Sequence, residues 1–388
     1  MLYESARLAD FSFSDVPQRR KRADSSFFAL VIILLTMGII MVLSSSYARA
    51  YYDPGKITGG DPIYFFVRQL IYALFGVGAM IAASFIPVSV YRKYAFHFLG
   101  AVVILLLLVP FIGVKANGAR RWIGVGGLTL QPSELAKLAV IISFSALISK
   151  NKSGMKTLRY GIIPFVLIIA VIIGLLVLEP HFSASVIIAA TGGIMMFLGG
   201  VRLVWFAAAF IIAGGGITVL LTMFPYASER IVTWRDPFAS SSDEGYQIVQ
   251  SLYSIGSGGL SGLGLGCSRQ KFLYLPEEHN DFIFSVVCEE LGFIGAMLIL
   301  ILFALLIIRG YWLAVNSRSR FSCLVCAGIT SLLAIQVILN VAVVTNLIPC
   351  TGISLPFFSY GGTALLLQMT EMGIILSASR EIPVMKTG

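Results

Sequence analysis

The chain has 388 residues, of which 57% are hydrophobic and only 12% are charged. Soluble domains carry about a quarter charged residues, so this composition excludes an ordinary water-soluble protein and indicates a membrane protein. The net charge of +9 would suggest a nucleic-acid partner in a soluble chain. In a membrane protein it follows from Lys- and Arg-rich cytoplasmic loops, so we expect no nucleic acid.

Apolar runs of about 20 residues are long enough to cross a bilayer as helices. Ten such runs follow a polar tail over residues 1–25, and a short tail over 381–388 ends the chain. The sequence predicts an all-α polytopic membrane protein with about ten transmembrane helices over residues 26–380. The first run is too long for a cleaved signal peptide, so we expect a retained anchor. The runs lie near residues 26–48, 63–87, 96–113, 132–149, 160–178, 182–200, 202–224, 281–308, 322–345 and 359–379.

Lys and Arg residues that flank these runs are distributed unequally between the two sides of the membrane. Seventeen lie on the side of the chain termini, and nine lie on the other side, four of them in one long loop. Because short cytoplasmic loops are rich in Lys and Arg, the asymmetry predicts that both termini are cytoplasmic. Residues 225–280 then form a large fourth extracellular loop, and loops of this length are commonly functional.

The middle of this loop has a helical apolar pattern followed by a glycine-rich stretch. Residues 246–255 predict an amphipathic or re-entrant helix packed on the bundle. For the glycine-rich stretch 256–266 we expect a flexible turn that faces a cavity, because irregular backbone within a membrane needs protein or water against it. The apolar stripe of the helix comprises Ile248, Val249, Leu252 and Tyr253.

Glu134 and Lys137 stand three residues apart in the fourth apolar run, so they share one helix face. A charge within a membrane helix indicates either a function or a buried pair. Two interpretations stay open: a structural ion pair, or a pair that lines a substrate cavity.

Further charges lie in the fourth extracellular loop. For Arg269 and Lys271 a solvated loop face and a ligand site fit the pattern equally well. We expect Glu277 and Glu278 to be solvated. The three histidines of the chain lie in separate segments, so the sequence shows no local metal cluster.

Asp281 follows Asn280 at the expected first turn of the eighth run. The helix dipole favours an ionised carboxylate there, whereas the apolar residues that follow would desolvate it and raise its pKa. These opposed effects predict a carboxylate that serves as a general base near neutral pH. A simple capping role at the helix N-terminus is the alternative.

Three separated segments resemble one known family. They are "NGARRWIGVGGLTLQPSELAKLA" (117–139), "GYQIVQSLYSIGSGGLSGLGLGCSRQKFLYLPEEHNDFIFSVVCEELGFIG" (245–295) and "GISLPFFSYGG" (352–362). On these motifs the chain resembles the SEDS family of shape, elongation, division and sporulation proteins, from the first run to the tenth. The stretch "SRQKFLYLPE" is more similar to the FtsW and SpoVE members than to RodA.

The resemblance implies a ten-helix peptidoglycan glycosyltransferase of the bacterial cytoplasmic membrane. Such an enzyme polymerises lipid II at the outer face, among membrane lipids, and pairs with a class B penicillin-binding protein. Asp281 matches the essential aspartate of the family. Arg121, Glu134 and Lys137 match its cavity residues, and the remaining candidates for substrate binding are Arg269, Lys271, His279 and Ser359.

The chain departs from the family pattern at two positions. His181 stands where the family often has an aspartate, in Pro180-His181-Phe182-Ser183-Ala184 against P-D-x-G-T, so the role of that aspartate does not transfer. Asn280 stands where threonine is usual and keeps a polar neighbour beside Asp281.

The chemistry that the resemblance implies needs a base and positive charge. Asp281 is the candidate base for the acceptor hydroxyl. Positive charge for the departing pyrophosphate would come from the basic side chains, with or without a divalent cation such as Mg²⁺ or Mn²⁺. A single base without a covalent nucleophile predicts inversion at the donor carbon.

Two other functions fit the same pattern. A transporter that flips lipid II would use the same cavity without forming a bond, and a scaffold for a transpeptidase would need no base at all. The sequence also leaves open whether division, elongation or spore cortex synthesis is served.

Overall fold

The computed structural model describes residues 23–52, 58–116, 119–125, 128–151, 154–208, 215, 232–239 and 243–382. Eight helical segments within these ranges are long and apolar enough to cross a membrane. The structure thus confirms a mostly helical polytopic membrane fold. The expected run near residues 202–224 falls largely outside the described residues. The helices are α1 (Ser25–Tyr51), α2 (Tyr64–Phe85), α3 (Val88–Ile112), α4 (Pro132–Lys150), α5 (Leu158–Gly161), α6 (Ile163–Leu178), α7 (Phe182–Gly199), α10 (Asp243–Gly258), α11 (Ile283–Val315), α12 (Arg320–Val344) and α13 (Gly362–Ser379).

Helix α13 is the tenth expected run, but it is not among the eight most apolar segments. The polar side chains of Gln368 and Glu371 lower its hydropathy, and both are buried. In a membrane protein, polar residues of this kind face the bundle interior rather than lipid. Helix α13 therefore lies inside the bundle, packed mainly along α2.

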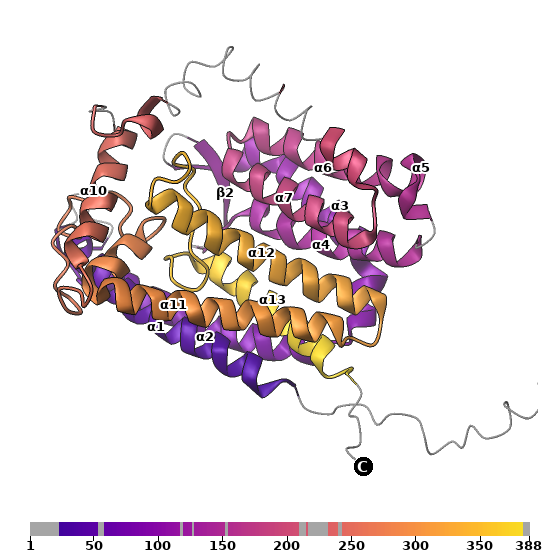
Figure 1. Cartoon of the computed structure of the whole chain (residues 1–388), viewed down its shortest axis with the longest axis horizontal. Helices are drawn as coiled ribbons and strands as arrows, with labels where there is room; N and C mark the ends of the chain where they lie inside the picture. Colours follow the sequence, from indigo (N-terminus) through magenta and orange to yellow (C-terminus); the bar gives the residue numbers. More distant parts are fainter. Residues whose placement is uncertain are drawn as a thin grey trace, which may run out of the picture.

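The helices form two packed groups, each with its own apolar core (Figure 1). One group contains α1, α2, α11, α12 and α13, and the other contains α3, α4, α6 and α7, with α3, α4 and α7 also contributing side chains to the first core. Helix α12 joins the groups because it contacts α11 on one side and α4 and α7 on the other. This arrangement leaves room for a cavity between the groups.

The first and last described helices meet at one end of the bundle. The Asp24 carboxylate caps α1 by accepting from the amide of Phe27 and forms an ion pair with Arg309 at 2.7 Å. The amide of Asp24 also donates to the hydroxyl of Ser379 at the end of α13, at 3.1 Å. The beginning of α1 and the end of α13 therefore lie on the same side of the bundle.

A small antiparallel sheet lies at the opposite end, and the sequence did not predict it. Its strands are β1 (Val114–Ala116), β2 (Ala119–Val125) and β3 (Leu128–Leu130), in the order β1-β2-β3. The sheet occupies the connection between α3 and α4, and its middle strand carries Arg120 and Arg121. The sheet thus fixes where these two arginines lie.

The helix that the sequence predicts within residues 225–280 is present as α10, but its buried face differs from the expected stripe. Ile248 is buried as expected, whereas Tyr253 is exposed. Two further buried positions are Ser251 and Ser254, whose hydroxyls donate to the carbonyl of Val344 and to the Glu289 carboxylate, at 2.7 and 3.0 Å. Hydrogen bonds to buried acceptors, rather than apolar contacts alone, hold α10 on the bundle.

The glycine-rich stretch after α10 does not line the cavity, which corrects the expectation of a turn facing it. It crosses α11 backbone to backbone where α11 is broken at Gly292, a residue with φ of 66° and ψ of −171°. The amides of Leu263 and Gly264 donate to the carbonyls of Glu289 and Glu290, at 2.9 and 3.0 Å. The loop amides therefore donate hydrogen bonds to carbonyls of α11 just before the break.

Candidate active site

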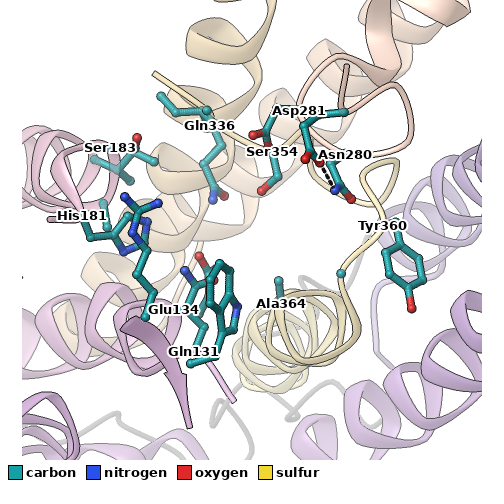
Figure 2. Close-up of a pocket in the computed structure, with 18 of the residues that line it drawn as sticks. Gln131, Glu134, His181, Ser183, Asn280, Asp281, Gln336, Ser354, Tyr360 and Ala364 are labelled. Carbon is teal, nitrogen blue, oxygen red and sulfur yellow. Dashed lines mark hydrogen bonds between the residues drawn. The ribbon is translucent and has the colours of Figure 1, made fainter. Parts of the chain in front are cut away.

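A cavity of about 860 Å³ opens between the two helix groups, at the end of the bundle that carries the sheet. Figure 2 shows His181 and Ser183 on one side of the cavity and Asp281 and Asn280 on another, with Glu134 between them. The lining comes from β2, the start of α4, the start of α7, the residues before α11 and the segment before α13. Residues from both helix groups therefore meet in this cavity, and several of them are charged.

The backbone around Asp281 is held by hydrogen bonds from two elements, α12 and the segment before α13. The buried Asn340 side chain on α12 donates to the carbonyl of Asp281 at 2.8 Å and to that of Ile353 at 2.6 Å. The hydroxyl of Ser359 donates to the carbonyl of Asn280 at 2.8 Å, and the amide of Tyr360 donates to that of His279 at 2.9 Å. These bonds join the residues before α11 to the segment before α13 and fix the position of Asp281.

The Asp281 carboxyl lines the cavity and is only partly exposed. Burial is the largest influence on it and, together with the nearby Glu277 carboxylate, raises its pKa to about 7, while Arg121 acts in the opposite direction. The N-cap of α11 is Phe282, and no side chain caps this helix. The alternative of a capping role for Asp281 is therefore wrong, and a base poised near neutral pH fits the structure.

Glu134 and Lys137 form an ion pair of 2.6 Å, and both line the cavity. The Lys137 side chain is 3% exposed and the Glu134 side chain 14%. The two interpretations that the sequence left open are thus not exclusive, because the pair is structural and also borders the cavity. A paired, buried Lys still presents its positive charge to groups across the cavity, where screening is weak.

Arg121 lies beside the start of α7. Its guanidinium donates to the carbonyl of Pro180 at 2.5 Å. Burial, together with the positive charges of Arg121 and Lys137, lowers the pKa of the neighbouring His181 to about 3, so this imidazole is neutral. Burial also raises the pKa of Glu179 to about 7, with Arg121 opposing. One side of the cavity is therefore basic, and the side of Asp281 and Glu277 is acidic.

Four other predicted site residues do not line the cavity. His279 and Ser359 are buried behind it, where the His279 ring packs on Phe65 with centroids 4.7 Å apart. Arg269 is exposed on the loop. Lys271 is buried in an ion pair of 2.9 Å with Glu290 and also donates to Ser44. The structure thus gives Lys271 a partner in the bundle instead of a place in the cavity.

Glu278 is not solvated, which corrects the expectation from the sequence. Its side chain is fully buried and accepts from the Arg49 guanidinium of α1 at 2.8 Å. Glu277 is partly exposed and lines the cavity, and its carboxylate accepts from the Asn280 amide at 2.5 Å. Neighbours in sequence thus have different environments because the chain turns between them.

The sequence interpretation missed several polar residues that line the cavity, among them Arg68 on α2 and Gln336 on α12. Arg68 is a charge within an apolar run, which is the signal that marked Glu134 and would have marked Arg68 as well. Gln336 is 3% exposed and uncharged, so no pattern distinguishes it from other polar residues of the run. Across the part of the chain that the structure describes, no group of three or more His, Cys, Asp or Glu side chains could hold a metal ion.

Comparisons with known proteins agree over nearly the whole chain. A family model described as a cell cycle protein, for FtsW, RodA and SpoVE, matches residues 24–383. Stage V sporulation protein E of Bacillus subtilis is 38% identical over 364 residues, which cover 93% of this chain and 98% of that protein. The probable peptidoglycan glycosyltransferase FtsW of Coxiella burnetii is 37% identical over 373 residues, covering 94% and 99%.

Solved structures have the same fold. A chain of a structure described as the structural coordination of polymerization and crosslinking by a peptidoglycan synthase complex matches with a TM-score of 0.77 and 26% identity, covering 92% of this chain and 98% of that one. The rod shape determining protein RodA of Thermus thermophilus matches with a TM-score of 0.68 and 25% identity, covering 93% and 97%. Sequence and fold agree that this chain is a multi-pass membrane protein and belongs to the SEDS family of FtsW, RodA and SpoVE.

Proposed function

We propose that the protein is a peptidoglycan glycosyltransferase that polymerises lipid II at the outer face of the bacterial cytoplasmic membrane, for division or spore cortex synthesis. The family and the named activity of the FtsW relatives support this activity. The observation that carries it is the partly exposed Asp281 carboxyl in the cavity, whose pKa is raised to about 7, with Arg121 close enough to influence it.

The reaction uses Asp281 as the general base. Its carboxylate takes the proton of the acceptor hydroxyl as the hydroxyl oxygen bonds to the donor sugar carbon. The bond from that carbon to the diphosphate oxygen breaks, and the diphosphate leaves with the electron pair. No second carboxylate is needed as a nucleophile, so the configuration at the donor carbon inverts, as in inverting glycosidases.

Arg121 and Lys137 supply the positive charge that a departing diphosphate needs. Fixed charges aimed at the leaving group stabilise the transition state without reorganising, which makes them effective in a water-poor site. Glu134 holds the Lys137 ammonium in place at 2.6 Å. The acidic side of the cavity thus supplies the base for the acceptor hydroxyl, and the basic side stabilises the departing diphosphate.

The proposed orientation in the membrane follows from the family and from the position of the start of α1 and the end of α13 on the same side of the bundle. Both termini lie in the cytoplasm, so the cavity opens outward, where lipid II presents its sugars. A class B penicillin-binding protein is the proposed partner, since a structural relative belongs to a complex that combines polymerization and crosslinking. Such a partner would crosslink the strands that this protein makes.

The test is glycan synthesis from labelled lipid II by purified protein. We expect wild-type protein to form polymer and Asp281→Asn to lose about a hundredfold to ten-thousandfold in turnover, the usual contribution of a general base. Asp61→Asn is the matched control, since Asp61 is an exposed carboxylate that does not line the cavity. Normal synthesis by Asp281→Asn at equal protein amount would remove Asp281 from the mechanism.

The two other functions predict different results. A lipid II transporter would move labelled lipid II across proteoliposomes without making polymer. A scaffold would support growth of a depleted strain equally well with Asp281→Asn, provided that the variant is present in the membrane at wild-type amount.

A further inference from the structure

The N-terminus of α7 opens into the basic side of the cavity. Phe182, Ser183 and Ala184, the first three residues of this 18-residue helix, all line the cavity. The first amides of a helix have no acceptor within the helix, and the helix dipole places partial positive charge there. No side chain caps α7. Such an end attracts anions, but on its own it does not identify a ligand.

His181 provides the second observation. It is the N-cap residue of α7, lines the cavity and is 9% exposed, and its Nδ1 is buried without a hydrogen-bond partner. A buried polar atom without a partner costs free energy that a bound acceptor would recover. Because the imidazole is neutral, one ring nitrogen carries a proton and can donate it in a hydrogen bond.

The charges around His181 favour an anion. Arg121 on β2 and Lys137 on α4 are both close enough to influence its titration. The acidic groups of this region are Glu134, which pairs with Lys137, Glu371, which is buried on α13 close enough to Lys137 to interact with it, and Glu179, whose raised pKa of about 7 leaves it partly protonated at neutral pH. Asp281 lies across the cavity, as Figure 2 shows. Arg121, Lys137 and the N-terminus of α7 therefore give the wall of the cavity beside His181 its positive charge.

The start of α7 is also held in place. The Ser183 hydroxyl donates to the carbonyl of Thr351, in the segment before α13. The guanidinium of Arg121 donates to the carbonyl of Pro180, just before His181. A helix end that is tethered on both sides presents its amides in a fixed direction, which lowers the cost of ordering them around a ligand.

We propose that His181 and the first turn of α7 form, with Arg121 and Lys137, the binding site for the diphosphate of the lipid-linked sugar substrate. This inference rests on the proposed function and extends it by assigning a role to His181. The imidazole and the α7 amides donate hydrogen bonds to diphosphate oxygens, while the two cations balance their charge. The donor sugar then extends from this side of the cavity toward Asp281.

The experiment measures binding of inorganic pyrophosphate by calorimetry to the full chain in nanodiscs of zwitterionic lipid, at fixed ionic strength. It takes the wild-type protein as the reference, because pyrophosphate carries no donor sugar and no turnover occurs. Against this reference we expect His181→Asp to raise the Kd at least tenfold, because it places a negative charge beside Arg121 and Lys137. His181→Phe keeps a ring without its N–H, and we expect a smaller increase of about threefold.

Arg120→Gln is the matched control for Arg121→Gln. The two arginines are neighbours on β2, but Arg120 is exposed, donates to the carbonyl of Pro110 and does not line the cavity. We expect Arg121→Gln to weaken pyrophosphate binding and Arg120→Gln to leave it unchanged. Thermal unfolding of each variant checks that it is folded.

Two results would overturn the assignment. One is the absence of pyrophosphate binding by folded protein. The other is an unchanged Kd in both His181 variants while Arg121→Gln weakens binding, which would place the anion away from α7. Failure of the proposed function has a different signature: pyrophosphate would bind as expected, whereas wild-type protein would make no glycan from lipid II.

Discussion

Asp281 combines two properties that a general base needs, access to substrate and a pKa near the working pH. Its carboxyl lines the cavity, and burial with the adjacent Glu277 raises its pKa from 3.8 to about 7. A base is active only when it is deprotonated, so the active fraction grows as the pH rises through this value. We expect kcat/KM to increase about tenfold per pH unit below pH 7 and to level off above it.

Glu179 must be separated from Asp281 in this measurement, because burial raises its pKa to about 7 as well. Glu179 does not line the cavity, so Glu179→Gln should keep the inflection of the pH profile of glycan synthesis. A pH-independent rate in Glu179→Gln, with the inflection lost, would assign the titration to Glu179 instead.

The ion pair of Glu134 and Lys137 allows a test of whether turnover depends on the position of the positive charge or only on the presence of an ion pair. Exchanging the charges, Glu134→Lys with Lys137→Glu, keeps a pair on one helix face but moves the positive charge one turn along α4. We expect the exchanged protein to fold and to lose roughly a hundredfold in turnover, as when one electrostatic contact to a transition state is removed. Labelled lipid II polymerisation at equal protein amount gives the measurement, and normal turnover would reduce the pair to a structural role.

Sequence alone predicted the cavity residues better than their surroundings. Glu134, Lys137 and Asp281 were identified because charges beside or within apolar runs are costly and thus informative. Arg121 was identified only through the resemblance to the family. The environments of Lys271 and Glu278 could not be predicted, because their partners Glu290 and Arg49 come from other elements. Distant partners of this kind leave no local pattern, so a loop charge that is solvated and one that is buried look alike in the sequence.

Among the elements, the membrane helices could be predicted and the small sheet could not. Long apolar runs specify helices in a membrane because every backbone polar group must be satisfied within the segment. Strands β1 and β3 have only three residues each, too few for an alternating pattern to be recognised. The break in α11 was also missed, since Gly292 lies within a continuous apolar run that otherwise indicates a single helix.

This break predicts a strong effect of Gly292→Ala. A Cβ at Gly292 would lie 2.2 Å from the amide nitrogen of Gly262, and the φ of 66° disfavours any other residue. We expect Gly292→Ala to destabilise the protein by about 1–3 kcal/mol from backbone strain, and by more where the loop is displaced. Thermal unfolding would measure the loss of stability. Hydrogen exchange of the Leu263 and Gly264 amides, which donate to carbonyls of α11, would detect displacement of the loop.

Gly256→Ala is the matched control. Gly256 lies in α10, and a Cβ there would meet nothing within 4 Å. Alanine in a helix is favoured over glycine by about 1 kcal/mol, so this variant should be neutral or slightly more stable. Equal stability of the Gly292 and Gly256 variants would contradict the close crossing of the loop over α11.

At the scale of the whole molecule, two helix groups joined by α12 place a basic and an acidic wall around one cavity. The basic wall comes from α4, β2 and the start of α7, and the acidic wall from the residues before α11. Neither helix group contains both walls. A site built in this way responds to any movement of one group relative to the other, because the distance between base and cations depends on how the groups pack.

The orientation of this assembly in the membrane is the last prediction. Asp24, Arg309 and Ser379 meet at one end of the bundle, and the cavity opens at the other. In the sequence, the expected side of the chain termini has the excess of Lys and Arg, seventeen against nine, which predicts that the first end faces the cytoplasm. We expect a reporter fused after Gly388 to be cytoplasmic and one inserted at Ser241 to be external. A cytoplasmic signal at Ser241 would place Asp281 on the cytoplasmic side as well, where it could not act on lipid II exposed at the outer face.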